Sequence, residues 1–329
     1  MIRRLARAMR RRPDAPALPA PPVAPTPPGA PAAPMSAAEL LAEINAEVPP
    51  GVDWRAGALR YVSAEFAKHG AEAMTRYLLS KPLAPVAPGG PGGGAELVED
   101  VEYLLNFVNL VALLDLPGRA RVLDVACGSG WVSHFLSRMN YDAHGFDICP
   151  DMVELTKRRL REDPLLAAAG GEGGFAGRFF VLDAEREELP AALRGAFDAV
   201  VMESCVHHFL DPISALSHIA AGLKEDGVAV VIEGENRRGP IRPEYLAVMR
   251  EFDTLERPYT RSQMERILPL AGLPAFRFLG RVNGWFSPDD PRVSALPQMV
   301  RDDAEGRNLA VCARSPAALA RVLPRLSPA

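Results

Sequence analysis

Between residues 96 and 314 the chain alternates short apolar runs with stretches of helical periodicity, and this alternation restricts the fold more than any other feature. Apolar runs of strand length are expected at 121–126, 143–147, 179–183, 197–203, 228–233, 276–282 and 308–313. Helices are expected at 98–114, 131–139, 151–162, 212–223 and 264–270. Strands separated by helices require crossover connections, which give a parallel sheet covered on both faces. We therefore predict an α/β fold with a doubly wound, mostly parallel seven-stranded sheet, and a ligand site at the carboxyl ends of its strands.

The first 95 residues are expected to divide into a tail and a helical extension. Residues 1–35 hold six arginines in the first twelve positions and then a Pro/Ala tract, a composition that has little to bury and favours disorder. This basic tail could contact an anionic membrane surface weakly, could be dispensable, or could precede a translation start at Met35. Residues 36–95 are expected to form a helical N-terminal extension and a loop, with a capping box at Ser36 and Glu39.

The composition argues against several classes of protein. A net charge of -4 gives no electrostatic basis for binding nucleic acid. No apolar run approaches the roughly 20 residues of a transmembrane helix, so no integral membrane span is expected. The four cysteines form no C-x-x-C pair, and no histidine stands at a metal-ligand spacing from them, so we expect no metal site. Reduced core thiols favour a cytoplasmic protein.

The segment 122–131 carries the strongest chemical signal in the chain. Its strand ends in Ala126-Cys127-Gly128-Ser129-Gly130, and a predicted helix follows. The glycines permit a tight turn and close approach of a ligand to the backbone, and the helix N-terminus offers unpaired N–H groups to an anion. By itself this pattern fits several nucleotide cofactors or a merely tight loop.

Three further features narrow the choice of ligand. A dinucleotide fingerprint would place its third glycine at position 133, where this chain has Ser133, which argues against a nicotinamide-dependent oxidoreductase. Asp124 lies inside the strand, where a buried carboxylate needs hydrogen-bond donors. Acids recur at the ends of later strands, as Asp147, Asp183 and Glu203, and they line one rim of the predicted sheet.

The run Val-Leu-Asp-Val-Ala-Cys-Gly-Ser-Gly at 122–130 resembles motif I of the class I methyltransferases that use S-adenosylmethionine (SAM). Further segments resemble later motifs of that family: Gly-Phe-Asp-Ile at 145–148, Val-Leu-Asp-Ala at 181–184, Phe-Asp-Ala-Val at 197–200, and the segments 223–228 and 259–273. The resemblance spans about 96–314 and implies a Rossmann-like methyltransferase fold with SAM as cofactor.

The resemblance also implies roles for individual residues. Asp147 is expected to hold both ribose hydroxyls of SAM, and Asp183 to contact the adenine amino group. From the residues alone, Asp147 could be only a helix-entry residue and Asp183 a surface acid. Glu203 is expected near the reactive sulfonium, where it could bind SAM or cap a loop. The full predicted SAM-binding set is Asp124, Ala126, Gly128, Gly130, Asp147, Ile148, Met152, Asp183, Ala184 and Glu203.

The enzyme has to hold a nucleophile in line with the S–CH3 bond, and an alcohol or phenol must also lose its proton. His207 and His208 follow the fourth predicted strand, and histidine titrates in the useful range, so they are the candidates for a general base. The alternative is that these histidines only pack beside the cofactor. A competing substrate-facing set is Glu233, Glu235 and Asn236.

We therefore predict that 96–314 is the domain of a SAM-dependent methyltransferase acting on a small-molecule or glycan acceptor, with oxygen as the expected acceptor atom. The arginine-rich segment 237–258 is expected to form a substrate lid with the N-terminal helices, and its arginines could meet an anionic acceptor. A non-catalytic SAM-binding or scaffold protein is the alternative. Methylation of protein or nucleic acid is disfavoured, because the core lacks a basic stripe and an Asn-Pro-Pro-Tyr-like motif. Residues 315–329 are expected to be a C-terminal tail.

Overall fold

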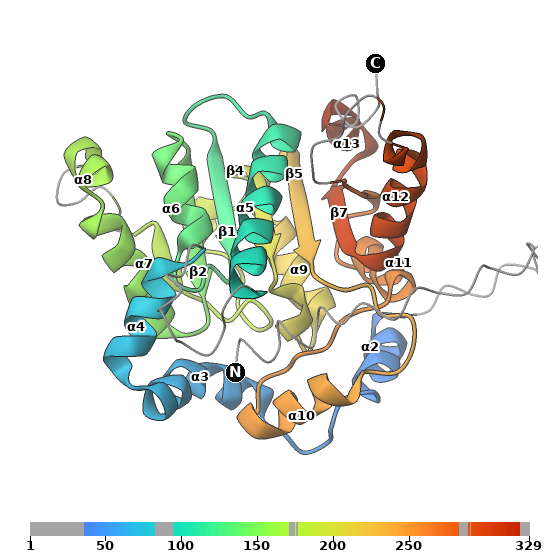
Figure 1. Cartoon of the computed structure of the whole chain (residues 1–329), viewed down its shortest axis with the longest axis horizontal. Coiled ribbons are helices and arrows are strands. Elements are labelled where there is room, and N and C mark those ends of the chain that lie inside the picture. The colour runs from blue at the N-terminus through green and yellow to red at the C-terminus, as the bar shows by residue number, and fades with distance from the viewer. Residues whose placement is uncertain are drawn as a thin grey trace, which may run out of the picture.

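The computed structural model of the chain describes residues 36–82, 95–170, 175, 177–282, 289 and 291–322. The predicted tail 1–35 and the loop 83–94 lie outside these residues. A seven-stranded sheet with the order β3-β2-β1-β4-β5-β7-β6 forms the centre of the fold (Figure 1). β7 pairs antiparallel with β5 and β6, and every other pairing is parallel. The predicted mostly parallel α/β sheet is therefore confirmed.

The strands coincide with the apolar runs seen in the sequence. They are β1 (Arg121–Val125), β2 (Asp142–Asp147), β3 (Phe179–Val181), β4 (Phe197–Glu203), β5 (Leu223–Glu233), β6 (Ala275–Phe278) and β7 (Asn308–Ala313). β5 begins earlier than predicted, because Leu223 already pairs with Phe197 before the ladder is interrupted. β1 lies between β2 and β4, so the strand order reverses at β1 and leaves a crevice at the carboxyl ends of these strands.

The helices fall before, between and after the strands. They are α2 (Ala37–Asn45), α3 (Trp54–His69), α4 (Ala71–Ser80), α5 (Ala95–Leu114), α6 (Trp131–Arg138), α7 (Pro150–Glu162), α8 (Pro164–Gly170), α9 (Pro212–Ala220), α10 (Pro243–Phe252), α11 (Arg261–Leu270), α12 (Arg292–Gly306) and α13 (Pro316–Val322). α8, α10 and α12 were not predicted. α12 contains Pro297, a residue that by itself argues against a helix interior. None of the helices in the described ranges is long and apolar enough to cross a membrane.

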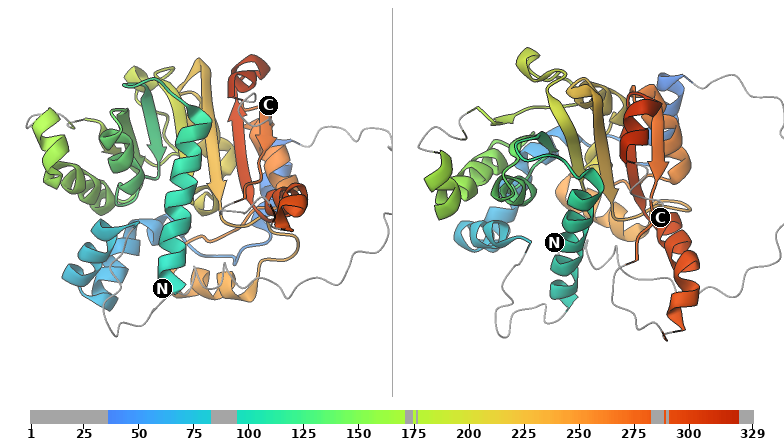
Figure 2. Two further views of the ribbon diagram at one scale, coloured as in Figure 1. Left: turned by 45° about the horizontal axis from the view of Figure 1, so that its top comes forward. Right: turned by 90° about the horizontal axis from the view of Figure 1, so that it is seen from above.

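Side chains that alternate along the strands pack against helices on both faces of the sheet. In β1, Val122 lies in the layer that contains α5, α6 and α13. The next residue, Leu123, lies in the opposite layer with α2, α9 and α11. Figure 2 shows the sheet between these two sets of helices. The doubly wound architecture therefore follows from the two-residue period of the strands.

The helical extension contributes to two parts of the molecule. The capping box predicted at Ser36 and Glu39 is present and begins α2, whose Leu40 and Ile44 are fully buried in the core of the sheet. α3 and α4 lie with α10 at the carboxyl ends of the strands (Figure 1). An apolar cluster joins Trp54 at the start of α3 to Tyr245 and Met249 of α10, so the extension and the segment after β5 form one cap.

The end of the chain differs from the tail expected for 315–329. Residues 316–322 form α13, which packs on β5 and β7 and buries Ala318, Leu319 and Val322. This helix is too short for its periodicity to be recognised in the sequence. Residues 323–329 lie outside the described part of the chain.

The contact between α3 and the turn after α10 depends on Gly57. A Cβ atom added there would lie 1.7 Å from the backbone oxygen of Asp253. We expect Gly57→Ala to lower the free energy of unfolding by about 1–3 kcal/mol, as overpacking does. Helix propensity alone predicts the opposite sign, by about 1 kcal/mol. Denaturant unfolding measures the difference. Gly239→Ala is the control, because its Cβ would meet no atom within 4 Å, and equal stability of the two variants would contradict the packing.

Candidate functional site

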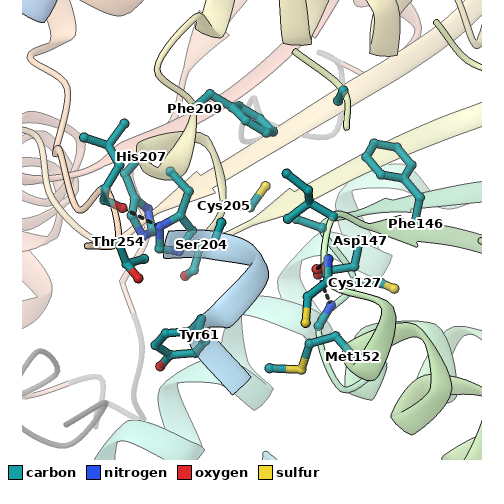
Figure 3. Close-up of a pocket in the computed structure, with 18 of the residues that line it drawn as sticks. Tyr61, Cys127, Phe146, Asp147, Met152, Ser204, Cys205, His207, Phe209 and Thr254 are labelled. Atoms are coloured by element: carbon teal, nitrogen blue, oxygen red, sulfur yellow. Dashed lines mark hydrogen bonds between the residues drawn. The ribbon is translucent and has the colours of Figure 1, made fainter. Parts of the chain in front are cut away.

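A cavity of about 670 Å³ lies where the strand order reverses, and it has the size of a small-molecule site, roughly 300–1,000 Å³. The loops that follow β1, β2, β3 and β4 line one side, and Trp54, Arg55 and Tyr61 of α3 close it together with residues 254–256. Figure 3 shows residues from these elements pointing into the cavity. All the predicted SAM-binding residues except Gly130 line it, and so do His207 and His208.

The loop after β1 turns through three residues with positive φ: Ala126, Gly128 and Gly130. Gly128 lines the cavity, and a Cβ there would have no close contact. Gly130 differs from the prediction, because it does not line the cavity. A Cβ on Gly130 would lie 2.5 Å from the side chain of Thr156 on α7, so this glycine allows the loop to pack against α7. Thr156 also donates a hydrogen bond to the Gly128 carbonyl at 2.8 Å, which holds the loop in place.

Asp124, the buried acid in β1, has its donors in the first turn of α6. Ser133 supplies both of them, its backbone N–H at 3.1 Å and its hydroxyl at 2.6 Å, to one carboxylate oxygen of Asp124. Burial nevertheless raises the pKa of Asp124 to about 7. The sequence analysis used Ser133 only as evidence against a dinucleotide site. The structure shows that its two hydrogen bonds to Asp124 connect α6 to β1.

Asp147 at the end of β2 is held by backbone amides. Gly128 N–H donates to one carboxylate oxygen and Cys149 N–H to the other, each at 2.9 Å. The group is buried, and burial raises its pKa. The Ile148 N–H also supports the charged form of this carboxyl group. A carboxylate can accept about four hydrogen bonds, so acceptor capacity remains on Asp147 for a ligand in the cavity.

Asp183 after β3 meets a partner that sequence reasoning missed. Arg55 on α3 donates its Nε–H to the Asp183 carboxylate at 2.6 Å, and Glu185 N–H donates to the other oxygen at 3.2 Å. The Arg55 side chain is 42% exposed, so this ion pair lies at the rim of the cavity. No local motif marks Arg55, because its partner follows 128 residues later. The adenine contact of Asp183 stays a prediction.

Glu203 at the end of β4 lies against α5. Asn106 donates its side-chain N–H to Glu203 Oε1 at 3.3 Å, and Arg281 donates to the side-chain oxygen of Asn106. Because arginine can only donate, this pair fixes the orientation of the Asn106 amide. Burial raises the pKa of Glu203 to about 7, the largest effect on this group. Glu203 is therefore protonated more easily than an exposed glutamate.

His207 lies in the short 3-10 turn η2 (Val206–His208) between two buried glutamates. Its Nδ1 is 2.5 Å from Glu233 Oε2, and its Nε2 is 3.4 Å from Glu256 Oε2. Burial opposes a charge on the imidazole, but the two carboxylates outweigh it and raise the pKa of His207 well above its usual range. Glu256 follows α10, and no signal in the sequence connected it with this histidine.

His208 has a different environment. Its Nδ1 lies 2.6 Å from the Leu255 carbonyl oxygen. A carbonyl only accepts, so Nδ1 carries the proton and Nε2 keeps its lone pair. Partial desolvation at the cavity wall and the neighbouring His207 lower the pKa of His208, which favours the neutral ring. The side chain is 39% exposed and lines the cavity, so of the two histidines His208 is the more accessible to a ligand.

The competing substrate-facing set lies outside the cavity lining. Glu233 accepts hydrogen bonds from the backbone N–H groups of Cys205 and Val206 and holds His207. Glu235 accepts from Tyr245 Oη at 2.6 Å. Asn236 accepts from the backbone N–H of Arg261. These polar groups therefore fix the loop after β5.

The arginines of the lid are likewise engaged within the protein. Arg237 is buried and bonds to Glu47 of the extension and to the Pro258 carbonyl. Arg242 pairs with Glu235. Neither side chain lines the cavity. The expectation that these two arginines meet an anionic acceptor is therefore not supported, and they stabilise the cap instead.

Comparison with known proteins identifies the family. The model of a family described as "Methyltransferase domain" matches residues 97–274, more than half of the chain. A ubiquinone biosynthesis O-methyltransferase from Xanthomonas campestris is 30% identical over 118 residues, 36% of this chain and 44% of that protein. A ubiquinone/menaquinone biosynthesis C-methyltransferase from Citrifermentans bemidjiense is 29% identical over 126 residues, 37% of this chain and 49% of that protein. The chain thus spans less than half the length of these relatives.

One solved structure shows the same fold at low sequence identity. The geranyl diphosphate C-methyltransferase from Streptomyces coelicolor A3(2), solved with Mg²⁺, geranyl diphosphate and S-adenosyl-L-homocysteine, superposes with a TM-score of 0.51. It is 15% identical, and the match covers 81% of this chain and all of that chain. The predicted Rossmann-like methyltransferase architecture is therefore confirmed.

The geometry of Asp147 predicts how much it contributes to cofactor binding. A hydrogen bond to a charged group contributes about 1.5–3 kcal/mol, so we expect Asp147→Ala to weaken SAM binding roughly 10- to 100-fold. Isothermal titration with SAM measures this change. Asp142→Ala is the matched control, because Asp142 begins the same strand and does not line the cavity. Equal SAM affinity in the two variants would argue against the ribose role of Asp147.

Proposed function

The chain belongs to the class I SAM-dependent methyltransferases, and on that premise we propose that it transfers the methyl group of SAM to a hydroxyl oxygen of a small-molecule or glycan acceptor. The observation that carries this proposal is the division of the cavity into two sides. Asp147 and Met152 lie on one side, and His207 and Thr254 lie on the other (Figure 3). We assign the first side to SAM and the second to the acceptor.

The donor side is suited to SAM by its shape and by its acceptor groups. Asp147 lines the cavity with a carboxylate that can still accept hydrogen bonds, as two adjacent ribose hydroxyls would require. Gly128 leaves open space at its α-carbon, so a ligand can approach the loop closely. Ile148 and Met152 supply apolar walls. SAM, when bound, supplies a methyl group that is already activated for transfer, and we propose that these residues hold it against the strand ends.

Glu203 and Asp124 complete the donor side. Asp124 is buried and Glu203 is partly buried, and the pKa of each is raised to about 7. A cationic sulfonium beside them favours their ionised forms, because opposite charges attract strongly where water is excluded. We propose that Glu203, oriented by Asn106, supports the positive end of the cofactor.

The acceptor side contains groups that an oxygen nucleophile needs. Transfer to a hydroxyl forms a C–O bond while the C–S bond breaks and its electron pair stays on sulfur, and the hydroxyl proton must leave. His208 presents a lone pair at the cavity, whereas both nitrogens of His207 face carboxylates. We therefore assign activation of the acceptor to His208 and the positioning of this turn to His207. This choice separates two histidines that were equivalent in the sequence.

The cap supplies the remaining requirement, which is the exclusion of water. Trp54 and Tyr61 of α3 close the cavity from the side opposite the strands, and Thr254 and Leu255 close it after α10. An acceptor of moderate size has to fit beneath these residues. A small molecule or the end of a glycan meets this condition, whereas a folded protein or a nucleic-acid duplex does not.

The role of His208 predicts a selective loss of activity. We expect His208→Gln to reduce kcat for methyl transfer by at least about 100-fold, the lower range for loss of a general acid–base group. SAM affinity should stay within about twofold, because His208 lies on the acceptor side. His218→Gln is the control: this half-buried histidine also bonds to a backbone carbonyl, that of Ala184, but does not line the cavity. A fully active His208→Gln enzyme would exclude the assigned role.

The acceptor atom can be tested without knowing the natural substrate. We expect labelled SAM to transfer its methyl group to hydroxyl-bearing members of a metabolite and glycan panel. Each compound is paired with its O-methyl ether, in which the same hydroxyl is already blocked, and product is detected by mass spectrometry. Label that appears only on carbon or nitrogen would contradict the oxygen assignment, and binding of SAM with no transfer to any class would contradict the proposed activity of the acceptor side.

A further inference from the structure

His207, His208 and Glu256 form a cluster on the acceptor side that no part of the proposed SAM site uses. One ring nitrogen from each histidine and one oxygen of Glu256 lie within 4.8 Å of one another. We propose that this cluster binds a first-row divalent transition cation, such as Zn²⁺ or Mn²⁺, which holds the hydroxyl of the acceptor. This inference rests on the proposed function, and it changes the role of His208 from proton acceptor to ligand of the cation.

The spacing of the donor atoms supports a single ion. His207 Nε2 and Glu256 Oε2 are 3.4 Å apart. Two ligands of one tetrahedral ion with bonds of about 2.0–2.1 Å lie roughly 3.3–3.4 Å from each other. His208 is the third ligand and the most exposed of the three, and one of its ring nitrogens lies within 4.8 Å of the other two ligand atoms. Two histidines and one carboxylate are a set that transition metals accept, and they leave positions open for a substrate oxygen.

Each histidine also has the outer hydrogen bond that metal ligands require. A ligating imidazole donates its other N–H to a carboxylate or a backbone carbonyl, which fixes the tautomer and the direction of the ring. Glu233 accepts from Nδ1 of His207, and the Leu255 carbonyl accepts from Nδ1 of His208. The Nε2 atoms are then the ones with lone pairs for a cation. Glu233 in turn is held by the backbone N–H groups of Cys205 and Val206, so the support extends to β4.

The charges in the cluster also favour a divalent ion. Glu233 and Glu256 are both buried, at 6% and 5% exposure, and both carboxylates contact the ring of His207. Burying two carboxylates beside one imidazole is costly without positive charge, and a divalent cation held by His207, His208 and Glu256 would supply that charge.

The ligands come from two segments that the fold holds rigidly together. Arg257, next to Glu256, donates its backbone N–H to the His207 carbonyl at 3.1 Å. Its guanidinium is fully buried and donates to the carbonyl oxygens of Phe209 and Ile44. The loop after α10 is therefore fixed against η2 and α2, which keeps Glu256 beside the two histidines.

Such an ion would take over from His208 the activation of the acceptor hydroxyl. A hydroxyl bound to a divalent cation loses its proton more easily and is held at a fixed place relative to the methyl donor. The acceptor is then an alcohol or phenol whose oxygen can reach the cation. A second oxygen on the neighbouring carbon would favour binding, because it could occupy another open coordination position of the cation.

Direct measurement of cation binding tests the inference. The full chain, purified without a histidine tag and treated with a chelator, is titrated with Co²⁺ while its visible absorption is recorded. We expect one ion per chain. His208→Gln and Glu256→Gln should each weaken binding at least 10-fold, and Glu233→Gln should weaken it roughly 10- to 100-fold through the outer hydrogen bond. His218→Gln should bind like the wild type, and circular dichroism verifies that each variant is folded.

Absence of stoichiometric Co²⁺ binding overturns the inference, as does unchanged affinity in folded His208→Gln and Glu256→Gln chains. Methyl transfer before and after chelation separates this inference from the proposed function. Transfer that stops with the chelator and returns with Zn²⁺ or Mn²⁺ supports both. Transfer that survives complete chelation overturns the cation site and leaves the methyltransferase assignment intact. A chain that binds one Co²⁺ ion at this cluster and methylates no hydroxyl supports the site and contradicts the oxygen assignment.

Discussion

Buried carboxylates at the carboxyl edge of the sheet are the constraint on which the rest of this structure depends. Parallel strands bring their ends to one edge, and this chain places acids there, so each acid must find a donor when water is removed. Asp124 is satisfied by Ser133, and Asp147 by backbone amides of two loops. Glu233 takes backbone N–H groups and His207. These bonds hold the loops that surround the cavity, so the same groups that stabilise the edge also shape the site.

The cap over the cavity joins two segments that lie far apart in the sequence, the N-terminal extension and the segment after β5. α3 precedes the first strand in sequence and α10 follows the fifth, yet they share the apolar cluster around Tyr245 and meet at Gly57. Arg237 and Arg257 are buried in the cap and bond mainly to backbone carbonyls and to residues of the extension. The sequence of 237–258 suggested that its arginines meet an anionic acceptor, but these two buried arginines hold the cap in place instead. Its rigidity matters for function because methyl transfer needs a dry cavity and an acceptor held in line with the donor.

The two sides of the cavity differ in how they are assembled. The donor side is formed by loops directly after the strands, where each residue lies at a place set by the sheet register. The acceptor side joins η2 after β4 to residues 254–256 after α10, so its chemistry arises from a long-range contact. The proposed donor residues are therefore placed by the sheet, and the proposed acceptor residues by the packing of the cap. Only this contact brings His208 and Glu256, the proposed cation ligands, together.

The sequence by itself determined the parts of this protein that depend on local periodicity and on short spacings. Alternating apolar runs fixed the seven strands, and the segment 122–130 with Asp147 identified the SAM-dependent family. Tertiary structure decided the rest: Arg55 on Asp183, Arg257 beneath the loop after α10, and the cluster of His207, His208 and Glu256. The reason is physical, since a side chain's charge and hydrogen-bond partners are set by neighbours that only folding brings near. α10 escaped prediction for the converse reason, because its local signal is weak and the burial of Tyr245, Val248 and Met249 in the fold stabilises it. α12 escaped because Pro297 argues against a helix and the helix buries none of its side chains.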